Sequence, residues 1–518
     1  MTNTSHNARR GGVYKKLMLA IAIILGLAIV LIVLEYFAGA SAKPVITDRY
    51  SAELEQRSLD RQAAYAGEGP NAYEQFAAIV MEAKAANDEL FDALLERLDQ
   101  QDTDEDDPWA HDAFEPLYFV PDEGTPEQFE FARQRGVQAL QDWEARGIFA
   151  RTAALHTLGP VARPPSDTVV EDIMVPFMGA SRTLARAQVA RGRVAAQAGD
   201  HATLVQATDE TLALGRHMGN LGYLIDWLVG VAVQELARSS MLDSLLLHPT
   251  SDEAILQELD ASIEREMQER MPTLADALRG ERLYLLDSLQ HYFTDDGNGG
   301  GRFLPLQYVR LVESEFFPVD STLTPFGDRT LSNIHGRLYL GRRETTQWFE
   351  GLFQRYIAAA EATSADAPTR AAEVGRYVDT ATWRNPVAQN SSIFFGTSLQ
   401  AERRRWIQAA GTRVLLAIER YRLQHGAPPA TLEDLGDLLP QDLRTDPYTN
   451  QPWHYEPTPA TITADGQPLL PGAHAWPYTL ASRPLPGRTP NPTEDRGIDP
   501  RTGVLITVPI QGPQYDTP

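Results

Sequence analysis

The chain contains no cysteine, and its basic residues are outnumbered by acidic ones. The absence of cysteine excludes disulfides, cysteine-ligated zinc, iron–sulfur clusters and thiol catalysis. Lysine plus arginine total 46 against 70 aspartate plus glutamate, which gives a formal net charge of −24. This deficit of positive charge argues against nucleic-acid binding, because phosphate contacts require a surplus of lysine and arginine. We therefore expect no nucleic-acid partner.

The sequence motifs of several common catalytic sites are also missing. There is no Gly-x-Ser-x-Gly turn, no His-Glu-x-x-His pair, no phosphate-binding loop and no Gly-x-Gly-x-x-Gly after a strand. The 11 histidines are scattered, and with 70 acidic residues no carboxylate pair can be selected. The sequence therefore assigns no catalytic and no cofactor-binding residue.

The longest apolar run occupies residues 17–34 and contains no charged residue. With the aromatic residues that follow, the segment 17–37 is long enough to cross a hydrocarbon core of about 30 Å. Residues 1–16 carry four basic residues and no acidic one, which favours a cytoplasmic location for this tail. The sequence therefore predicts a single-pass protein that contacts the lipid bilayer through residues 17–37 and exports the remainder.

Two kinds of processing are alternatives to an uncleaved transmembrane helix. Residues 38–42 place small side chains at the positions that signal peptidase requires, so the segment could be a removable signal. The apolar run is longer than the usual 7–15 residues of such a signal, which favours retention. Gly11-Gly12 is similar to a prepilin leader, but Leu17 stands where pilins carry glutamate. We therefore reject prepilin processing and leave signal cleavage open.

Residues 45–395 are predicted to form an extracytoplasmic α-helical domain, a bundle or an array of helical hairpins. Helical spacing of apolar residues is clear over 90–98 and almost continuous from 172 to 248. The segment 221–247 is apolar nearly all round, but Asp226 and Gln234 within it would be costly in a bilayer. We therefore expect a helix buried in the bundle and not a second membrane span.

One helical hairpin resembles a tetratricopeptide repeat. In residues 190–214, Gly192 and Gly199 stand where that family places small residues, one where the paired helices approach closely and one at the turn. Leu204 and Thr211 depart from the alanines that the family pattern has at these positions. A generic helical hairpin is the alternative, since about three stacked repeats are needed to bury a continuous core.

Residues 397–518 are predicted to form a long helix followed by a small α+β module. The helix should end at Gly426, and Thr431 should cap a short second helix. Asp446-Pro447 then turns the chain into a strand at 453–455. This order resembles the globular half of the major pseudopilins of type II secretion, which implies a pseudopilin-like fold for the module.

The pseudopilin resemblance also implies calcium binding in the closing loop. Asp495 and Asp499 are the remaining acidic candidates, but the family's Ser-x-Gly-x-Asp-Gly run is replaced here by Ser-Arg-Pro-Leu-Pro-Gly. The acidic stretches 102–107 and 295–298 have a weaker calcium-like spacing. A solvated loop is the alternative at each place, and calcium is the one metal that the sequence suggests.

The whole arrangement is similar to that of large membrane-anchored exported proteins of bacteria such as planctomycetes. That resemblance implies architecture and a location in the bacterial inner membrane, with the C-terminal bulk in the periplasm. We expect a non-enzymatic envelope or secretion-associated protein that binds protein partners. The alternative is an anchored hydrolase, which should show a pocket with buried, mutually bonded acidic and basic side chains.

Overall fold

The chain is described from a computed structural model in which helices dominate, as predicted. Among the described residues, no helix is both long enough and apolar enough to cross a membrane, and the predicted membrane segment 17–37 lies outside them. The structure describes residues 43–47, 49–64, 71–101, 114, 117, 126–159, 161–163, 170–268, 271–304, 338–362, 366–382, 384–391, 395–447, 450–458, 475–481, 498–499 and 503–504.

The chain divides into two compact units. The first comprises Met1–Glu53, Arg282–Arg355 and Glu373–Ile393, and the second comprises Leu54–Glu281, Tyr356–Ala372 and Phe394–Pro518. The domain boundary predicted near residues 395–397 stays a prediction. Each unit is built from segments that are distant in sequence.

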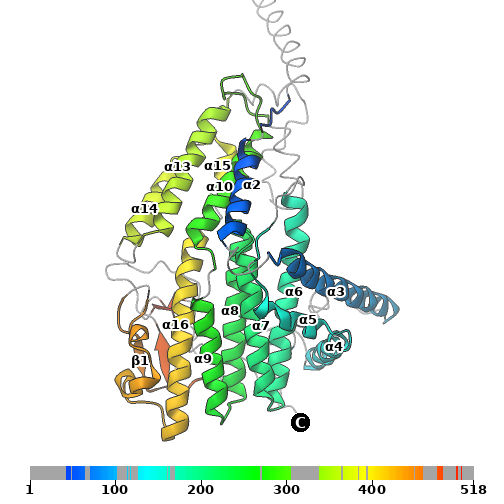
Figure 1. Cartoon of the computed structure of the whole chain (residues 1–518), viewed down its shortest axis with the longest axis vertical. Coiled ribbons are helices and arrows are strands. Elements are labelled where there is room, and N and C mark those ends of the chain that lie inside the picture. Colours follow the sequence, from blue (N-terminus) through cyan, green and yellow to red (C-terminus); the bar gives the residue numbers. More distant parts are fainter. Residues whose placement is uncertain are drawn as a thin grey trace, which may run out of the picture. The chain divides into compact units, whose positions relative to one another are not determined.

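Helices form the bulk of the second unit. They are α3 (Tyr73–Gln101), α4 (Pro126–Ala145), α5 (Ile148–Thr152), the 3-10 helix η2 (Ala153–Thr157), α6 (Val170–Gln197), α7 (His201–Gly219), α8 (Leu224–Leu247), α9 (Glu253–Gln268) and α16 (Phe395–His425). Of these, α6, α7, α8, α9 and α16 lie side by side in a bundle (Figure 1). Helix α8 packs against α6, α7 and α16, and most of its side chains are buried. This confirms the helix predicted to be buried within 221–247.

Helices α6 and α7 form the hairpin expected from the glycine pattern. A Cβ atom on Gly192 would lie 3.1 Å from the Cβ of Ala207, so α7 approaches α6 closely at this point. Gly199 has a φ of 82°, a left-handed conformation that glycine adopts without strain. Asp200 then caps α7 by accepting the backbone N–H of Thr203. The two glycines therefore have the roles predicted for them, in a hairpin.

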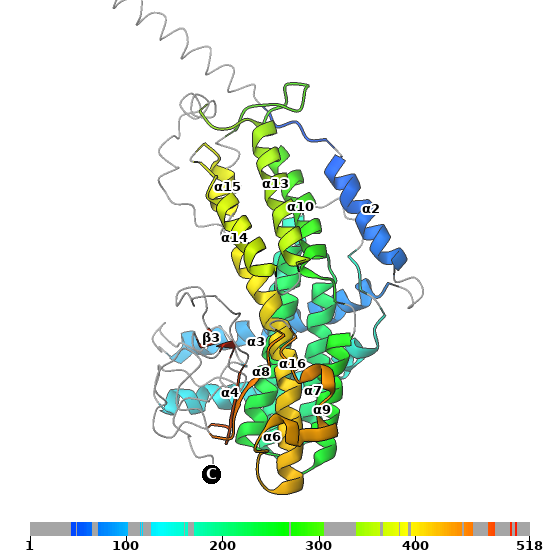
Figure 2. The same ribbon diagram turned by 90° about the vertical axis from the view of Figure 1, so that its left-hand side faces the viewer.

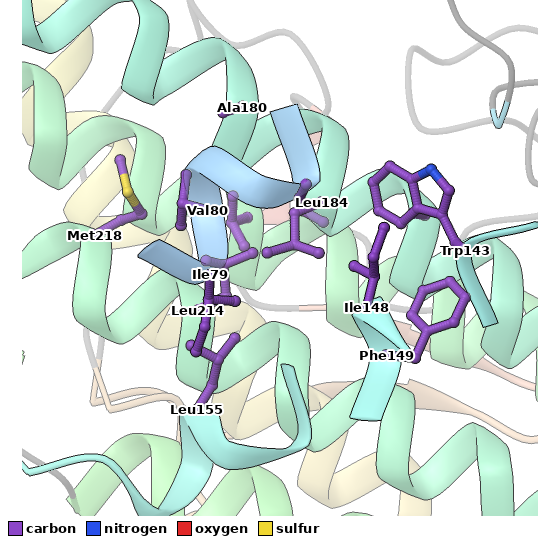
Figure 3. Close-up of a cluster of buried hydrophobic side chains, with 14 of the residues drawn as sticks. Ile79, Val80, Trp143, Ile148, Phe149, Leu155, Ala180, Leu184, Leu214 and Met218 are labelled. Atoms are coloured by element: carbon purple, nitrogen blue, oxygen red, sulfur yellow. The ribbon is translucent and has the colours of Figure 1, made fainter. Parts of the chain in front are cut away.

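A large hydrophobic cluster holds α3, α5, α6 and α7 together (Figure 3). Val80 of α3, Leu184 of α6 and Leu214 of α7 are completely buried within it. At one end, Trp143 lies edge-on to Phe114, with ring centroids 4.9 Å apart. Burial of a leucine or valine side chain of this kind contributes about 1.5–3 kcal/mol, so this cluster is a main source of stability for the second unit.

The residues after α16 follow the predicted order of elements. Gly426 ends the helix with a φ of 78°, and the side chain of Thr431 forms a capping box with Asp434 at the start of the 3-10 helix η5 (Leu432–Leu438). The remaining elements are η6 (Gln441–Leu443), β1 (His454–Glu456), β2 (Thr479–Ala481), β3 (Ile498–Asp499) and β4 (Gly503–Val504). Strands β1 and β2 pair in antiparallel register, as do β3 and β4.

The first unit contains parts of four helices that also contribute residues to the second. These are α2 (Arg49–Ala64), α10 (Leu274–Gln290), α13 (Arg342–Ala360) and α14 (Ala367–Val378), together with α15 (Pro386–Ser391), which belongs to the first unit alone. Within this unit α10 and α13 lie alongside each other (Figure 2), joined by an ion pair of 2.6 Å between Arg282 and Glu350. Arg342 reaches Gln290 at 2.9 Å and Asp295 at 3.2 Å.

Candidate functional site

A polar cavity of about 300 Å³ lies between α7 and α9 in the second unit. We call it the α7–α9 cavity. Its volume is at the small end of the range for ligand sites, which run from about 300 to 1,000 Å³. It therefore has room for a small molecule and not for a large cofactor. Its lining residues are Asp209, Leu212, Ala213, Arg216, Ser262, Arg265 and Glu266.

Helical spacing places the lining residues on one face of each helix. In α7, positions 212 and 213 are three and four residues after 209, and 216 follows them at the same spacing; in α9, positions 265 and 266 are three and four residues after 262. The Arg265 side chain is half exposed, at 51%, whereas that of Glu266 is only 2% exposed. The lining therefore includes both a half-exposed arginine and an almost completely buried glutamate.

Glu266, one of the lining residues, forms a buried ion pair with Arg238 of α8. Arg238 Nη1 donates a hydrogen bond of 2.5 Å to Glu266 Oε1, and both side chains are 2% exposed. Glu266 Oε2, Arg238 Nε and Arg238 Nη2 have no hydrogen-bond partner among the described residues. Leaving such a buried polar atom unsatisfied costs about 1–3 kcal/mol. This ion pair is therefore incompletely satisfied by the protein.

Two further arginines determine the electrostatics of the cavity. Arg265 donates a hydrogen bond of 2.7 Å to Asp209 and one of 3.2 Å to the hydroxyl of Ser262. Burial lowers the pKa of Arg216, and Arg265 lowers it further, whereas Asp209 and Glu266 oppose this effect. Guanidinium groups remain charged at neutral pH, so the lining combines two positive charges with the acidic residues Asp209 and Glu266.

A second group of buried polar residues surrounds the first turn of α8. We call Arg163, Tyr223, Asp226 and Glu281 the α8 N-terminal cluster. Asp226 is completely buried, and Arg163 Nη2 donates to its Oδ1 over 3.2 Å. Glu281 of α10 accepts the backbone N–H of Leu224 over 3.2 Å. Anions are stabilised at such a helix N-terminus.

Close backbone packing positions this cluster. A Cβ atom on Gly280 would lie 2.1 Å from the carbonyl oxygen of Gly222, so only glycine allows α10 to approach the turn before α8. Gly222 itself has a φ of 123°, which other residues rarely adopt. Arg61 donates to the carbonyl of Asn220 in the same turn, over 3.2 Å.

The carboxyl groups of the α8 N-terminal cluster have raised pKa values. Burial and the neighbouring Asp226 raise the pKa of Glu281 to about 7, against the effect of the Leu224 N–H. Burial also raises the pKa of Asp226, although the Arg163 guanidinium opposes this. A carboxyl group that titrates near neutral pH can exchange a proton with a substrate. The cluster therefore has one requirement of an acid–base site.

The predicted calcium ligands are only partly covered by the structure. Asp499 lies on β3, where it pairs with Gly503, and Asp495 lies outside the described residues, as does the stretch 102–107. Asp296 instead accepts the backbone N–H groups of Asn298 and Gly300. No group of three or more potential metal ligands occurs in the part of the chain that the structure describes. Calcium binding through Asp495 and Asp499 stays a prediction.

No sequence signal identified the residues of the α7–α9 cavity. One residue of the α8 N-terminal cluster was recognisable, because Asp226 is an acidic residue inside an apolar helix, a position that requires a partner. Arg216 and Arg265 occupy helices that are separate in sequence, and their spacing gives no indication of a shared cavity.

Comparison of the chain with protein-family models, with curated proteins and with solved structures finds no match to any of them.

Proposed function

We propose that this chain is a membrane-anchored extracytoplasmic binding protein whose helical body holds a small polar ligand in the α7–α9 cavity. The observation that carries the proposal is a cavity of about 300 Å³ lined by four charged side chains. The charged lining residues are Asp209, Arg216, Arg265 and Glu266. Sites for small ligands combine such a concave volume with a few directed polar groups.

The ligand proposal is tested by filling the cavity. Ala213 lines it and is 2% exposed, so Ala213→Leu should occupy space that a ligand needs. Ala202→Leu is the matched control, because Ala202 is an exposed residue of the same helix. The full-length variants are purified from membranes, and the small molecules released on denaturation are identified by mass spectrometry.

We expect the wild type and Ala202→Leu to release the same small molecule, and Ala213→Leu to release much less of it. Overpacking of a buried site costs about 1–3 kcal/mol, so the thermal unfolding of each variant is measured to establish that it is folded. If folded Ala213→Leu retains the same molecule in the same amount, the cavity is not its binding site and the proposal is wrong.

The anchored topology is a separate part of the proposal, supported by the apolar segment 17–37 and the basic tail 1–16. In intact spheroplasts, protease added from outside should degrade the bulk of the chain. After fractionation, the full-length chain should be found in the membrane. Recovery of the intact chain from the soluble cytoplasmic fraction would contradict the anchor, whatever the cavity binds.

We also propose that the C-terminal segment 397–518 contacts protein partners of the envelope or of a secretion system. The order of α16, η5, β1 and β2 supports this proposal, because it follows the pseudopilin-like sequence of elements. Crosslinking in membranes followed by affinity purification and mass spectrometry should recover envelope proteins joined to this segment. Recovery of lipids and general chaperones alone would remove its support.

A second candidate function is hydrolysis by the α8 N-terminal cluster. The specific observation in its favour is Glu281, whose pKa is raised to about 7 beside the buried Asp226. A panel of chromogenic esters, phosphates and glycosides provides the test. An activity that is lost in Glu281→Gln, but retained in Glu350→Gln as a control, would support the hydrolase. If the wild type turns over none of these substrates, hydrolysis of these classes is excluded.

A further inference from the structure

We infer that the first unit docks on the surface of the lipid bilayer, with the side chains of Val45, Ile46 and Leu338 in the interfacial layer. This inference rests on the anchored topology of the proposed function and goes beyond it, because it places a surface of the helical body on the lipid. It follows from the exposure of these three side chains, from the basic residues around them and from their short distance along the chain from segment 17–37.

Hydrogen bonds fix residues 43–47 to the rest of the first unit. The backbone N–H and the hydroxyl of Thr47 both donate to Gln290 Oε1, over 2.9 and 2.8 Å. Arg342, which is 9% exposed, donates to the same oxygen over 2.9 Å and to the carbonyl of Val45 over 3.0 Å. The chain that follows the predicted membrane segment is therefore held against the start of α13.

Other segments of the first unit lie at the same end, as Figures 1 and 2 show. We call residues 43–47, 291–304 and 338–344, together with Arg384, the loop end of the first unit. The backbone N–H of Arg342 donates to the carbonyl of Gly301 over 3.0 Å. That of Leu340 donates to the carbonyl of Arg384 over 2.7 Å. Backbone hydrogen bonds therefore join the segments of the loop end.

Exposed apolar side chains are concentrated at the loop end. Val45 is 44% exposed, Ile46 51% and Leu338 49%. They are three of the six large apolar side chains that are exposed in the described part of the chain. Single exposed apolar residues are normal on a protein surface, whereas several in one region mark a contact with another molecule or with a membrane.

The loop end is also basic, in a chain whose net charge is −24. Its charged residues are Lys43, Arg302, Arg342, Arg343 and Arg384, against Asp295, Asp296 and Glu344. The side chains of Arg343 and Arg384 are exposed and donate hydrogen bonds to the backbone carbonyls of Asn298 and Leu338, which carry no net charge. An anionic lipid surface therefore attracts this end and repels the acidic chain as a whole.

The chain between the loop end and the predicted membrane segment is short. Only residues 38–42 separate segment 17–37 from Lys43, the first residue that the structure describes. An extended chain spans at most about 3.6 Å per residue, so Lys43 lies within about 22 Å of the end of that segment, and Val45 within about 30 Å. The anchor therefore keeps the loop end close to the headgroup layer.

The composition of this surface fits a lipid better than a protein partner. Apolar side chains flanked by lysine and arginine are typical of interfacial membrane contacts, where the apolar groups enter the acyl boundary and the basic groups stay among the headgroups. A stable protein–protein interface buries about 800 Å² per partner and uses roughly 20–30 residues a side. Three exposed apolar side chains supply only a small part of that.

The test uses the absence of cysteine from the full-length chain. A single cysteine is introduced as Ile46→Cys and labelled with an environment-sensitive fluorophore. Gln354→Cys is the matched control, because Gln354 is an exposed residue of α13 in the same unit, about 18 Å further along the helix than Arg342. Each protein is reconstituted into vesicles of phosphatidylethanolamine and phosphatidylglycerol, with and without a lipid that carries a doxyl quencher near its headgroup. Thermal unfolding establishes that both labelled variants are folded.

We expect the doxyl lipid to quench Ile46→Cys at least about threefold more than Gln354→Cys, because only the first position lies in the interfacial layer. Replacement of phosphatidylglycerol by phosphatidylcholine should reduce the quenching at Ile46→Cys about twofold or more, since the attraction of the basic residues is lost. Adding Lys43→Glu to the labelled Ile46→Cys protein should reduce the quenching in anionic vesicles and leave it unchanged in vesicles of phosphatidylcholine.

Other outcomes overturn the inference in distinguishable ways. If alkaline carbonate extracts the chain from the vesicles, the anchor fails, and the docking fails with it. If the chain is retained but the two positions are quenched equally, the anchor stands and the docking is wrong. A blue shift of Ile46→Cys without quenching, which grows with the ratio of protein to lipid, would identify a second copy of this chain as the occupant. Quenching that is the same in both kinds of vesicle would remove the role of the basic residues.

Discussion

Helix α7 presents two buried polar regions that differ in how completely they are satisfied. On the side that packs against α5 and α6, which we call the closed face, Glu210 Oε2 accepts a hydrogen bond of 2.7 Å from Gln188, and Thr152 Oγ1 lies 3.1 Å from it. Its Oε1 accepts a hydrogen bond of 2.7 Å from Gln206. On the cavity side, which we call the open face, the corresponding buried acid is Glu266.

The contrast shows which buried acid is fully satisfied by the protein and which is not. Glu210 is 1% exposed and both of its oxygens are satisfied by the protein. Glu266 is equally buried, but one of its oxygens is not satisfied by the described residues. Native proteins satisfy nearly all buried polar groups. The two faces therefore differ in how completely the protein satisfies a buried acid.

The largest expected effect comes from breaking the ion pair of the open face. In Arg238→Met, the carboxylate of Glu266 would stay buried without the guanidinium group that now pairs with it. The free energy of unfolding should therefore fall by about 3–5 kcal/mol. Urea unfolding followed by tryptophan fluorescence measures this loss. The double variant Arg238→Met/Glu266→Leu should recover most of it, because it removes both charges. A loss below about 1 kcal/mol in the single variant would contradict the role assigned to the pair.

A pH dependence is expected from the closed face. His217 Nε2 donates a hydrogen bond of 2.7 Å to the carbonyl of Leu155, and burial lowers the pKa of His217 to about 4, from an ordinary value of 6.5. Between these values the unfolded chain takes up a proton that the folded chain does not, so stability falls as the pH falls. The slope is about 1.4 kcal/mol per pH unit, or about 2 kcal/mol from pH 6.5 to 5.

The variant His217→Gln isolates this effect. Its free energy of unfolding should not show the loss that His217 causes in the wild type as the pH falls below 6.5. The difference between the variant and the wild type is measured at several pH values. Glu281, with a pKa raised to about 7, acts in the opposite direction, because its unfolded form loses a proton first as the pH rises. That contribution cancels in the difference. A difference that is constant with pH would mean that His217 titrates normally.

A smaller loss is expected when the satisfied acid is altered. Glu210→Gln keeps the shape of the side chain and one acceptor oxygen. The other oxygen is replaced by an NH₂ group, a donor that would face the donor Gln188 or Gln206. We expect a loss of about 1–2 kcal/mol in unfolding free energy. Glu266→Gln should cost more, because it leaves the charge of Arg238 buried without its carboxylate. Equal losses in the two variants would remove the distinction between the two faces.

Much of the fold could be predicted from the sequence because its signals are local. The polar residues Asp226 and Gln234 within an apolar segment indicated a buried helix, and both are completely buried in α8. Gly199 and Gly426 indicated helix ends, and each has the left-handed backbone that makes glycine favourable there. Such features depend on a few neighbouring residues, so they can be recognised without the tertiary structure.

The candidate site could not be predicted in the same way. Arg216 and Arg265 occur in helices with charges at ordinary spacing, which is typical of a solvated surface. Their convergence depends on how α7 and α9 pack, and on the burial of Arg238 behind them. The predicted calcium candidates, Asp495 and Asp499, came from a resemblance and from acidic spacing, neither of which depends on packing. The sequence thus reveals elements more readily than the contacts between distant elements.

The smallest expected effect compares two buried hydroxyl groups. Ser262, on the open face, accepts a hydrogen bond of 3.2 Å from Arg265, which keeps its bond of 2.7 Å to Asp209 when the hydroxyl is removed. Ser262→Ala should therefore change the unfolding free energy by about 0.5 kcal/mol or less. Thr152→Val, on the closed face, should cost about 1–1.5 kcal/mol, because Thr152 contacts two other buried side chains, Gln188 and Glu210. Urea unfolding of both variants decides the point: a larger loss for Ser262→Ala would mean that the cavity wall is rigid and structural, and that the open face is not adapted to a ligand.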